Sequence, residues 1–368
     1  MKFKTYTMED ALEAIIDYRG KTPKKSDSGI PTLSAKSVKN NHIDYSLCYY
    51  ISPDEYKHFM VRGFPKVGDV LLTTEAPMGM VARLDRDNVG IAQRLLTLRG
   101  KKDVLDNEYL LYFLQSSIGQ SLLKARETGT TVTGIKQSEF RKIKINIPEI
   151  SVQKKIGGIL RSLDQKIELN TKINENLEQQ AQALYQQYYV TKADSDWHIG
   201  HLSDLINVKY GKDHKKLADG IYPVYGSGGI MRYVERPLYE KESVLIPRKG
   251  TLNNVIYVNQ PFWSVDTMFY TEMKQPNVAK FVYHFMKSKD LASMNAGSAV
   301  PSMTTSILNA MELRIPSPET LESFECSVAP MYEVMQGNET QSHKLAELRD
   351  TLLPKLMSGQ LDISKVQF

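Results

Sequence analysis

Hydroxyl, amide and cationic side chains gather on a few short glycine-rich runs, a combination that suits contacts with the phosphates and base edges of nucleic acid. The glycine- and threonine-rich loop Thr128–Gly134 lies inside a basic run from Lys124 to Lys144. In the second half, the basic turn Pro247–Thr251 directly follows a strand-like run, whereas its counterpart Thr74–Pro77 holds an acid. Arginine favours guanine O6 and N7, and an acid can accept from cytosine N4. Surface solvation explains any single loop equally well.

These loops and the basic residues around them supply our candidate DNA-contact residues. The second half adds the glycine-rich run Tyr225–Gly229 and the pair Lys215–Lys216, which matches Lys24–Lys25. The candidates in the first half are Lys24, Lys25, Lys36, Thr74, Arg94, Thr130, Thr131 and Lys136. Those in the second half are Lys215, Lys216, Tyr225, Ser227, Arg248, Lys249, Thr251 and Ser298.

Sequence motifs for catalysis are missing. Gly20-Lys21-Thr22 resembles the end of a P-loop, but Ile15 stands where that loop needs its first glycine. The sequence has no Asn-Pro-Pro-Tyr or Asp-Pro-Pro-Tyr, no G-x-G-x-x-G after a strand and no H-E-x-x-H, and its 7 histidines are scattered. We therefore predict neither a catalytic site nor a metal site in this chain.

Length and composition indicate two or more globular domains. The chain has 368 residues, of which 41% are hydrophobic, and a net charge of +5 that permits an acidic partner without requiring one. Only Cys48 and Cys326 are present, which argues against a disulfide framework or a cysteine-based zinc site. The N-terminal run lacks the apolar core of a secretory signal, and no run of about 18 apolar residues occurs, so we expect a cytoplasmic protein without a membrane span.

The sequence repeats itself after 168 residues. That number separates Gly129 from Gly297, in the runs GTTV and GSAV, and it also separates Pro148 from Pro316, in the closing runs INIP and LRIP. Each proline leads into a long helical pattern. A period this long exceeds the roughly 20–50 residues of solenoid repeats, so we interpret it as a duplicated domain.

Mixed segments alternate with helical ones, and four segments are predicted: 1–148, 149–196, 197–316 and 317–368. The polar run 191–198 suits a linker, and Ser151 is expected to cap the first long helix. Strand-like runs are Asp69–Thr73, Lys142–Ile147, Ser243–Pro247 and Met311–Ile315, and helical runs are Asn107–Ala125 and Val278–Lys287.

The two long helical patterns share one heptad register. Apolar residues recur at alternating spacings of four and three, which is typical of a coiled-coil seam, and adding 168 to one register gives the other. Polar residues occupy the centre of both. The predicted seam residues are Ile156, Leu160, Leu163, Ile167, Asn170, Leu177, Leu184, Met331, Met335, Asn338, Leu345 and Leu352.

We expect the two helices to pair with one another, although each could instead pack on its own domain. About 34 residues at about 1.5 Å each give a rod of roughly 50 Å. If the helices are antiparallel, the two domains would lie at opposite ends of that rod. Pro330 is expected to bend or break the second helix.

These features together resemble the specificity subunit (HsdS) of a type I restriction–modification system over the whole length. The resemblance rests on the two runs that begin with GTTV or GSAV and close with INIP or LRIP. The run LRDTLLPKLMSG at Leu348–Gly359 is a further, specific signature. The resemblance implies an α+β fold with two similar α/β target-recognition domains separated by two long helices packed as an antiparallel coiled coil.

The resemblance also implies a function. Each recognition domain would read one half of a split site in double-stranded DNA, and the coiled coil would set the gap. Two methyltransferase subunits would dock on the helices and use S-adenosylmethionine, and two restriction-translocase subunits can join and use ATP and magnesium. This bacterial or archaeal chain would bind no cofactor itself. A stand-alone nuclease or methyltransferase and a protein scaffold remain the alternatives.

Overall fold

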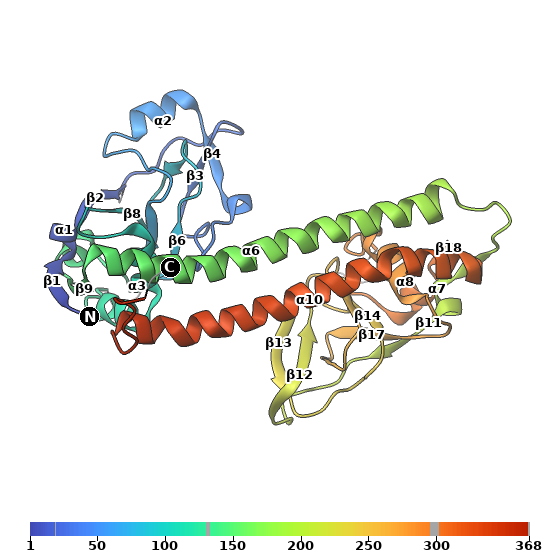
Figure 1. The fold of residues 1–368 in the computed structure, drawn as a ribbon. Coiled ribbons are helices and arrows are strands. Elements are labelled where there is room, and N and C mark those ends of the chain that lie inside the picture. Colours follow the sequence, from blue (N-terminus) through green and yellow to red (C-terminus); the bar gives the residue numbers. More distant parts are fainter. Residues whose placement is uncertain (19, 130–132, 295–301, 367–368) are drawn as a thin grey trace. The chain divides into compact units, whose positions relative to one another are not determined.

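The structure is a computed structural model that describes residues 1–18, 20–129, 133–294 and 302–366 (Figure 1). The chain divides into two compact units. Unit 1 comprises Met1–Asn170 with Glu339–Phe368, and unit 2 comprises Thr171–Asn338. The two long helices, α6 (Ile150–Gln186) and α10 (Pro318–Met357), each contribute one part to each unit. Each unit is therefore a globular domain together with its own stretch of both helices.

The described residues in the globular part of unit 1 form three small sheets. A two-stranded sheet pairs β1 (Phe3–Thr7) with β9 (Lys144–Pro148), antiparallel. A four-stranded sheet has the order β2 (Leu12–Asp17), β8 (Leu95–Gly100), β5 (Val70–Thr73), β6 (Val81–Arg83). A three-stranded sheet has the order β4 (Tyr49–Ile51), β3 (Ile30–Leu33), β7 (Gly90–Ile91). The short helical elements are α1 (Met8–Ala11), η1 (Tyr45–Leu47), α2 (Pro53–Phe59), α3 (Asn107–Gln115), α4 (Ser117–Lys124) and α5 (Gln137–Arg141).

Unit 2 repeats this topology strand for strand. Its two-stranded sheet pairs β10 (Ile199–His201) with β18 (Glu312–Arg314). Its four-stranded sheet has the order β11 (Ile206–Tyr210), β17 (Met268–Met273), β14 (Ser243–Pro247), β15 (Ile256–Val258). Its three-stranded sheet has the order β13 (Gly229–Val234), β12 (Asp219–Gly226), β16 (Trp263–Ser264). The short helices are α7 (Leu202–Leu205), α8 (Ala279–Lys287) and α9 (Thr305–Asn309). The matching sheet orders confirm two similar domains of mixed helix and strand.

The predicted helix Asn107–Ala125 is two helices, because Ser116 ends α3 and begins α4. Its hydroxyl accepts from Gly119 N at 3.2 Å as the N-cap of α4. Gly119 suits this corner, since a Cβ there would lie 2.1 Å from the carbonyl oxygen of Phe113. Most side chains of α3 are buried, so the helix anchors the sheet of unit 1 against α6.

Within each unit the two long helices run antiparallel. In unit 1, Arg349 Nη1 donates to Asp164 Oδ1 at 2.8 Å, and Asn170 Nδ2 donates to Ser342 Oγ at 3.1 Å, so positions rise in α6 as they fall in α10. In unit 2, Asn338 Nδ2 donates to Asn174 Oδ1 at 2.8 Å. The polar centre of the predicted seam is therefore a hydrogen-bonded layer, and the predicted pairing of the helices is confirmed.

The remaining seam residues are all withdrawn from solvent to some degree. Ile156 and Leu160 are fully buried in the core of unit 1. The half-buried seam residues are Leu163, Ile167, Leu177, Leu184, Met331, Met335, Asn338, Leu345 and Leu352. Neither helix is only a surface element, because each packs on a domain and on the other helix.

The structure contradicts two expectations for the long helices, a break in the second helix at Pro330 and a cap on the first at Ser151. Pro330 does not break α10, which is continuous through that position. The proline lies on the exposed side, so the carbonyl left without its partner can bind water, and buried Phe324 and Val328 hold the turn against the core. Ser151 does not cap α6, because the helix begins at Ile150 and the carbonyl of Glu149 accepts from the first turn. Boundary errors of one or two residues are common at helix ends.

A polar pair fastens each domain to its helices at equivalent positions. In unit 1 the Tyr112 hydroxyl of α3 donates to Asp164 Oδ2 of α6 at 2.6 Å. In unit 2 the sixth residue of α8 is His284, and its partner at 2.9 Å is the Tyr332 hydroxyl of α10, which lies 168 positions after Asp164. The position of the contact is kept, and the chemistry of the pair has changed.

His284 is a buried neutral side chain. Its Nδ1 contacts Gln182 Oε1 at 2.7 Å, and only 1% of its surface is exposed. Burial lowers its pKa to about 4, with Lys287 lowering it further and Glu178 opposing the shift. The neutral ring can thus donate from Nδ1 to Gln182 and accept at Nε2 from Tyr332.

Unit 2 is therefore expected to lose stability on acidification. Because the folded pKa of His284 lies below its ordinary value of 6.5, its contribution is complete above about pH 6.5 and is lost as the pH falls towards 4, at most by about 3 kcal/mol. His284→Gln should flatten this dependence while lowering stability at pH 7. Hydrogen exchange of unit 2 peptides between pH 4 and 7 measures the effect, with exposed His343→Gln as the control. An unchanged slope in the His284 variant would contradict it.

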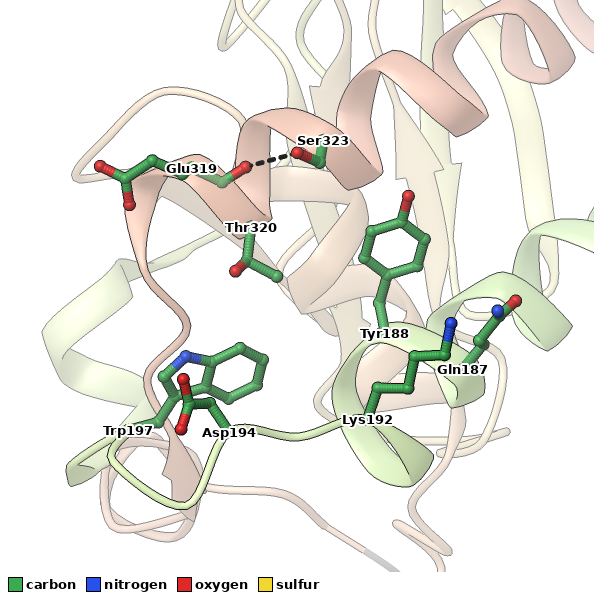
Figure 2. Close-up of a pocket in the computed structure, with 8 residues that line it drawn as sticks. All are labelled: Gln187, Tyr188, Lys192, Asp194, Trp197, Glu319, Thr320 and Ser323. Atoms are coloured by element: carbon green, nitrogen blue, oxygen red, sulfur yellow. Dashed lines mark hydrogen bonds between the residues drawn. The ribbon is translucent and has the colours of Figure 1, made fainter.

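A pocket of about 440 Å³ lies where α6 ends and α10 begins in unit 2 (Figure 2). A π-helical turn, η2 (Gln187–Thr191), closes α6 at this point. Ser323 turns its hydroxyl back to donate to the carbonyl of Glu319 at 2.8 Å. The lining residues are Gln187, Tyr188, Lys192, Asp194, Trp197, Glu319, Thr320 and Ser323.

Unit 1 fills the equivalent place with a lysine. Lys155 lies 168 positions before Ser323, and its ammonium donates to the carbonyls of Ser364 and Val366 at 3.1 and 2.7 Å. This lysine ties the segment after α10 to α6, and buried Ile363 adds an apolar anchor. Unit 2 has no such tie at Ser323.

Ser323→Lys is expected to stabilise unit 2 by ~0.5–1.5 kcal/mol, because the new ammonium can reach the linker carbonyls or the Asp194 carboxylate. Denaturant unfolding and hydrogen exchange of residues 191–198 measure the gain. Ser323→Met fills the same space without a charge and serves as the control. Equal effects of lysine and methionine would show that the tie is not formed.

Among the described residues, none of the helices is long and apolar enough to cross a membrane.

Candidate nucleic-acid interface

In unit 1, the turn after β5 is joined by its backbone to two other loops. Thr74 N donates to the carbonyl of Arg94 at 2.9 Å, and Ile135 N donates to the carbonyl of Thr74 at 2.9 Å. Glu75 and Gly134 form an isolated antiparallel bridge. Three segments distant in sequence therefore meet at one end of the four-stranded sheet, and we call residues 74–78, 93–94 and 133–136 loop cluster 1.

In unit 2, the same hydrogen bonds join the turn after β14. Arg248 N donates to the carbonyl of Thr267 at 2.8 Å, and Met303 N donates to the carbonyl of Arg248 at 2.9 Å. Lys249 and Ser302 form the isolated bridge. We call residues 248–251, 266–267 and 302–303 loop cluster 2. Arg248 thus occupies the place of Thr74, and Lys249 occupies that of Glu75.

The two clusters present different charges on this common frame. In cluster 1 the guanidinium Nε of Arg94 lies 2.7 Å from Glu75 Oε1, and the arginine side chain is 53% exposed. Arg94 also adopts a left-handed backbone (φ 70°), which non-glycine residues rarely do outside functional or strained loops. In cluster 1, therefore, the carboxylate of Glu75 orients the exposed guanidinium of Arg94.

In cluster 2 an aromatic ring supports the arginine instead. The guanidinium of Arg248 lies 5.4 Å from the ring centroid of Tyr210, and its Nη1 donates to the carbonyl of Asp266 at 3.2 Å. Lys249 and Thr251 are exposed beside it. The turn of residues 248–251 thus carries two cations, Arg248 and Lys249, where the equivalent turn of cluster 1 carries Glu75.

Glycines allow tight turns at both clusters. Gly79 (φ 92°) approaches Gln120 of α4 so closely that a Cβ would lie 2.5 Å from Gln120 Oε1. Gly250 (φ 85°) approaches Ser227 just as closely, because a Cβ on Gly250 would lie 2.7 Å from Ser227 Oγ. Asn254 Nδ2 also donates to the carbonyl of Ser227 at 2.8 Å. The tip of the β12–β13 hairpin therefore belongs beside loop cluster 2.

A hollow of about 570 Å³ adjoins loop cluster 1. It opens between the turn after β5 and α4, and it is lined by Ala76, Pro77, Met78, Gln120, Ser121, Lys124, Glu127 and Thr133. Among the residues that the structure describes, no group of three or more His, Cys, Asp or Glu side chains is arranged to hold a metal ion.

A family model for the type I restriction modification DNA specificity domain matches residues 2–179 and 194–322. The chain belongs to this family. The chain is 25% identical to the type I restriction enzyme MjaIX specificity subunit of Methanocaldococcus jannaschii, over 92% of this chain and 88% of that protein. It is 22% identical to the HindI specificity subunit of Haemophilus influenzae, over 80% and 87%. The crystal structure of the S subunit from M. genitalium has the same fold, with a TM-score of 0.62, 19% identity, and 97% and 96% coverage.

Membership of the specificity family assigns the chain to sequence-specific DNA recognition in a type I restriction–modification system. Lys25 Nζ lies 4.9 Å from the ring centroid of Tyr49, and burial raises the pKa of that tyrosine to about 12. Besides Arg94, Lys249 and Thr251 of the two loop clusters, the other exposed candidates are Lys24, Lys36, Lys136, Lys215 and Lys216.

The exposed lysines differ in how far their charge is offset. The carboxylate of Asp213 accepts from the backbone N of Lys215 at 3.0 Å, and this bond lowers the pKa of Asp213. Asp213 therefore stays charged and offsets part of the positive charge of Lys215 and Lys216.

Two candidates lie inside the protein. Tyr225 is only 8% exposed, because β12 pairs on both sides and the tyrosine ring packs edge-on against Phe262. Thr74 is 5% exposed and contributes its backbone to loop cluster 1. The structure therefore argues against direct DNA contact by either side chain. Thr130, Thr131 and Ser298 lie outside the described residues.

Sequence reasoning missed several residues of the clusters. Gln93 Nε2 donates to Thr22 Oγ1 at 2.7 Å and so connects the loop before β3 to cluster 1. Tyr210 at the end of β11 and Asp266 in the turn between β16 and β17 support Arg248. Only the pairing of the strands brings these residues next to Arg248, and no local sequence motif indicates that pairing. A repeat-aware alignment of the two four-stranded sheets could have found them.

Proposed function

We propose that the chain reads a bipartite DNA site, with loop cluster 1 contacting one half and loop cluster 2 the other. One observation carries this proposal. The same backbone frame presents Thr74 and Glu75 in one unit and Arg248 and Lys249 in the other. A backbone arrangement shared by both units but carrying different side chains fits two DNA-contacting surfaces with different sequence preferences.

The positioning and reading roles follow from the geometry of each cluster. Arg94 and Arg248 are the candidate base readers, because each has an exposed or half-exposed guanidinium with a supporting group. Lys249 and the exposed lysines would neutralise phosphates and would add salt dependence rather than sequence preference.

The chain would supply recognition and no chemistry. Two methyltransferase subunits docked on α6 and α10 would methylate with S-adenosylmethionine, and two restriction-translocase subunits could join with ATP and magnesium. Assaying the lone chain for methyl transfer or DNA cleavage tests this division, since turnover without partners would contradict it. Footprinting with the methyltransferase partner, together with sequencing of methylated bases with and without the gene, would identify the two half-sites.

We further propose that the helix pair sets the gap between the half-sites. Removing Thr171–Leu177 from α6 and Met335–Gln341 from α10 deletes one heptad from each helix at facing positions. The pair would shorten by about 10 Å, or about three base pairs. Both half-sites should stay the same while the gap between them decreases. A variant lacking the heptad from α6 alone is the control, because it loses the seam register. An unchanged gap in the double deletion would refute the ruler.

A further inference from the structure

The β12–β13 hairpin of unit 2 exposes two apolar side chains directly after its tip. Figure 1 shows this hairpin by its labels β12 and β13. Gly226 pairs with Gly229 at the tip, and the next residues of β13 are Ile230 and Met231. Their side chains are 50% and 60% exposed. β13 is the edge strand of its sheet, and large apolar residues on an exposed edge are a liability unless something covers them.

The tip of this hairpin lies beside the turn that carries the cations of loop cluster 2. Ser227 at the tip accepts from Asn254 through its carbonyl and lies against Gly250. Met231 folds across the tip, since a Cβ on Gly226 would lie 2.6 Å from its sulfur. Met231 thus lies at a tip that contacts the turn carrying exposed Lys249, and Ile230 precedes it on the same strand.

A surface that is apolar and cationic at once fits the DNA major groove. Thymine presents a C5-methyl group there, and aliphatic side chains recognise it by contact, while the phosphates beside it attract lysine. A protein partner would need an apolar patch bordered by acids to match the same surface. DNA supplies both features in every thymine-containing groove.

The hairpin tip is peculiar to unit 2. In unit 1 the equivalent strands β3 and β4 are joined by residues 34–48, which include η1, rather than by a two-residue tip. Unit 1 therefore lacks the feature, as expected if it serves the base preference of one half-site alone.

We propose that Ile230 and Met231 contact thymine methyl groups in the half-site read by unit 2, with Lys249 on a neighbouring phosphate. This inference rests on the proposed function of loop cluster 2. It makes the hairpin a specificity determinant for A·T pairs, separate from the arginine contact.

Thymine-to-deoxyuridine substitution tests the inference, because it removes only the methyl group. The full chain in complex with its methyltransferase partner is titrated with duplexes in which every thymine of one half-site is replaced. We expect about a fourfold loss of affinity per contacted methyl in the half-site that Arg248→Ala also weakens. Ile230→Thr and Met231→Gln should lose affinity for thymine DNA and show no further loss with deoxyuridine. Ile221→Ala, on the same hairpin and 78% exposed, should behave as wild type on both.

Several results would overturn the inference. These are a unit 2 half-site without thymine, equal binding of the two DNAs by the wild type, or variants that bind DNA normally but fail to assemble with the methyltransferase. The last would make the hairpin a protein interface. Failure of the proposed function is distinguishable, since the wild-type complex would then prefer no bipartite site at all.

Discussion

Arg248→Ala is expected to weaken binding to one half of the bipartite site by ~1–3 kcal/mol and to leave the other half unaffected. Hydrogen bonds to Thr267 and Met303, in two neighbouring loops, fix the backbone of Arg248, and Tyr210 and Asp266 orient its guanidinium. A preoriented arginine can form two hydrogen bonds to guanine with little loss of side-chain freedom. Titration of the methyltransferase complex with duplexes randomised in one half-site at a time measures the effect.

Arg94→Ala is the matched variant in the other unit and should weaken only the opposite half-site. Arg248→Lys separates the possible contacts, because lysine keeps the charge but cannot form the bidentate bond. If lysine restores binding fully, Arg248 contacts a phosphate. Equal losses at both half-sites from either alanine variant would contradict separate readers.

Lys280→Met is expected to destabilise unit 2 by about 3–5 kcal/mol, the size of effect seen when a buried ion pair loses one partner. Only 5% of Lys280 is exposed. Its ammonium lies 3.1 Å from Glu242 Oε1 and 2.5 Å from Glu325 Oε1, and the rings of Tyr257 and Tyr332 flank it. Without the lysine, two carboxylates would face one another with no cation between them. Denaturant unfolding of the full chain, with hydrogen exchange to locate the loss in unit 2, measures it.

The same helix provides the control. Lys287 pairs with Glu178 at 3.0 Å, but its side chain is 38% exposed, so Lys287→Met should cost no more than about 1 kcal/mol. Adding Glu325→Gln to Lys280→Met removes one of the facing charges and should recover part of the loss. Equal effects of the two lysine substitutions would contradict the assignment of Lys280 as a buried ionic tie.

The elements whose apolar residues recur at a regular spacing could be predicted from the sequence. The heptads around Ile156 and the polar centre at Asn170 and Asn338 predicted which helix faces meet, because seam positions depend on spacing alone. The closing strands could be predicted for the same reason: alternation and a terminal proline are local signals. The structure places them as β9 and β18.

What depends on distant pairing could not be predicted. Tyr225 was expected on the surface because its glycine-rich neighbours suggest a loop, and only the presence of strands on both sides of β12 shows that it is buried. Pro330 was expected to interrupt α10 because local propensity ignores the packing of Phe324 and Val328. The equivalence of Thr74 with Arg248 likewise depends on hydrogen bonds to loops that are distant in sequence.

The altered polar pairs between domain and helix bear on how a duplicated chain folds correctly. Each globular half meets two helix stretches of nearly the same apolar pattern, so hydrophobic contact alone distinguishes the right stretch from the wrong one poorly. Tyr112 set against Tyr332 would lose its carboxylate acceptor, and His284 set against Asp164 would have to change tautomer or take up a proton before its Nε2 could donate to the carboxylate. The two polar pairs therefore disfavour the exchanged pairing, in which each domain would pack on the helix stretch of the other unit. Chimeras that transplant one domain should fold best when the matching helix residue moves with it.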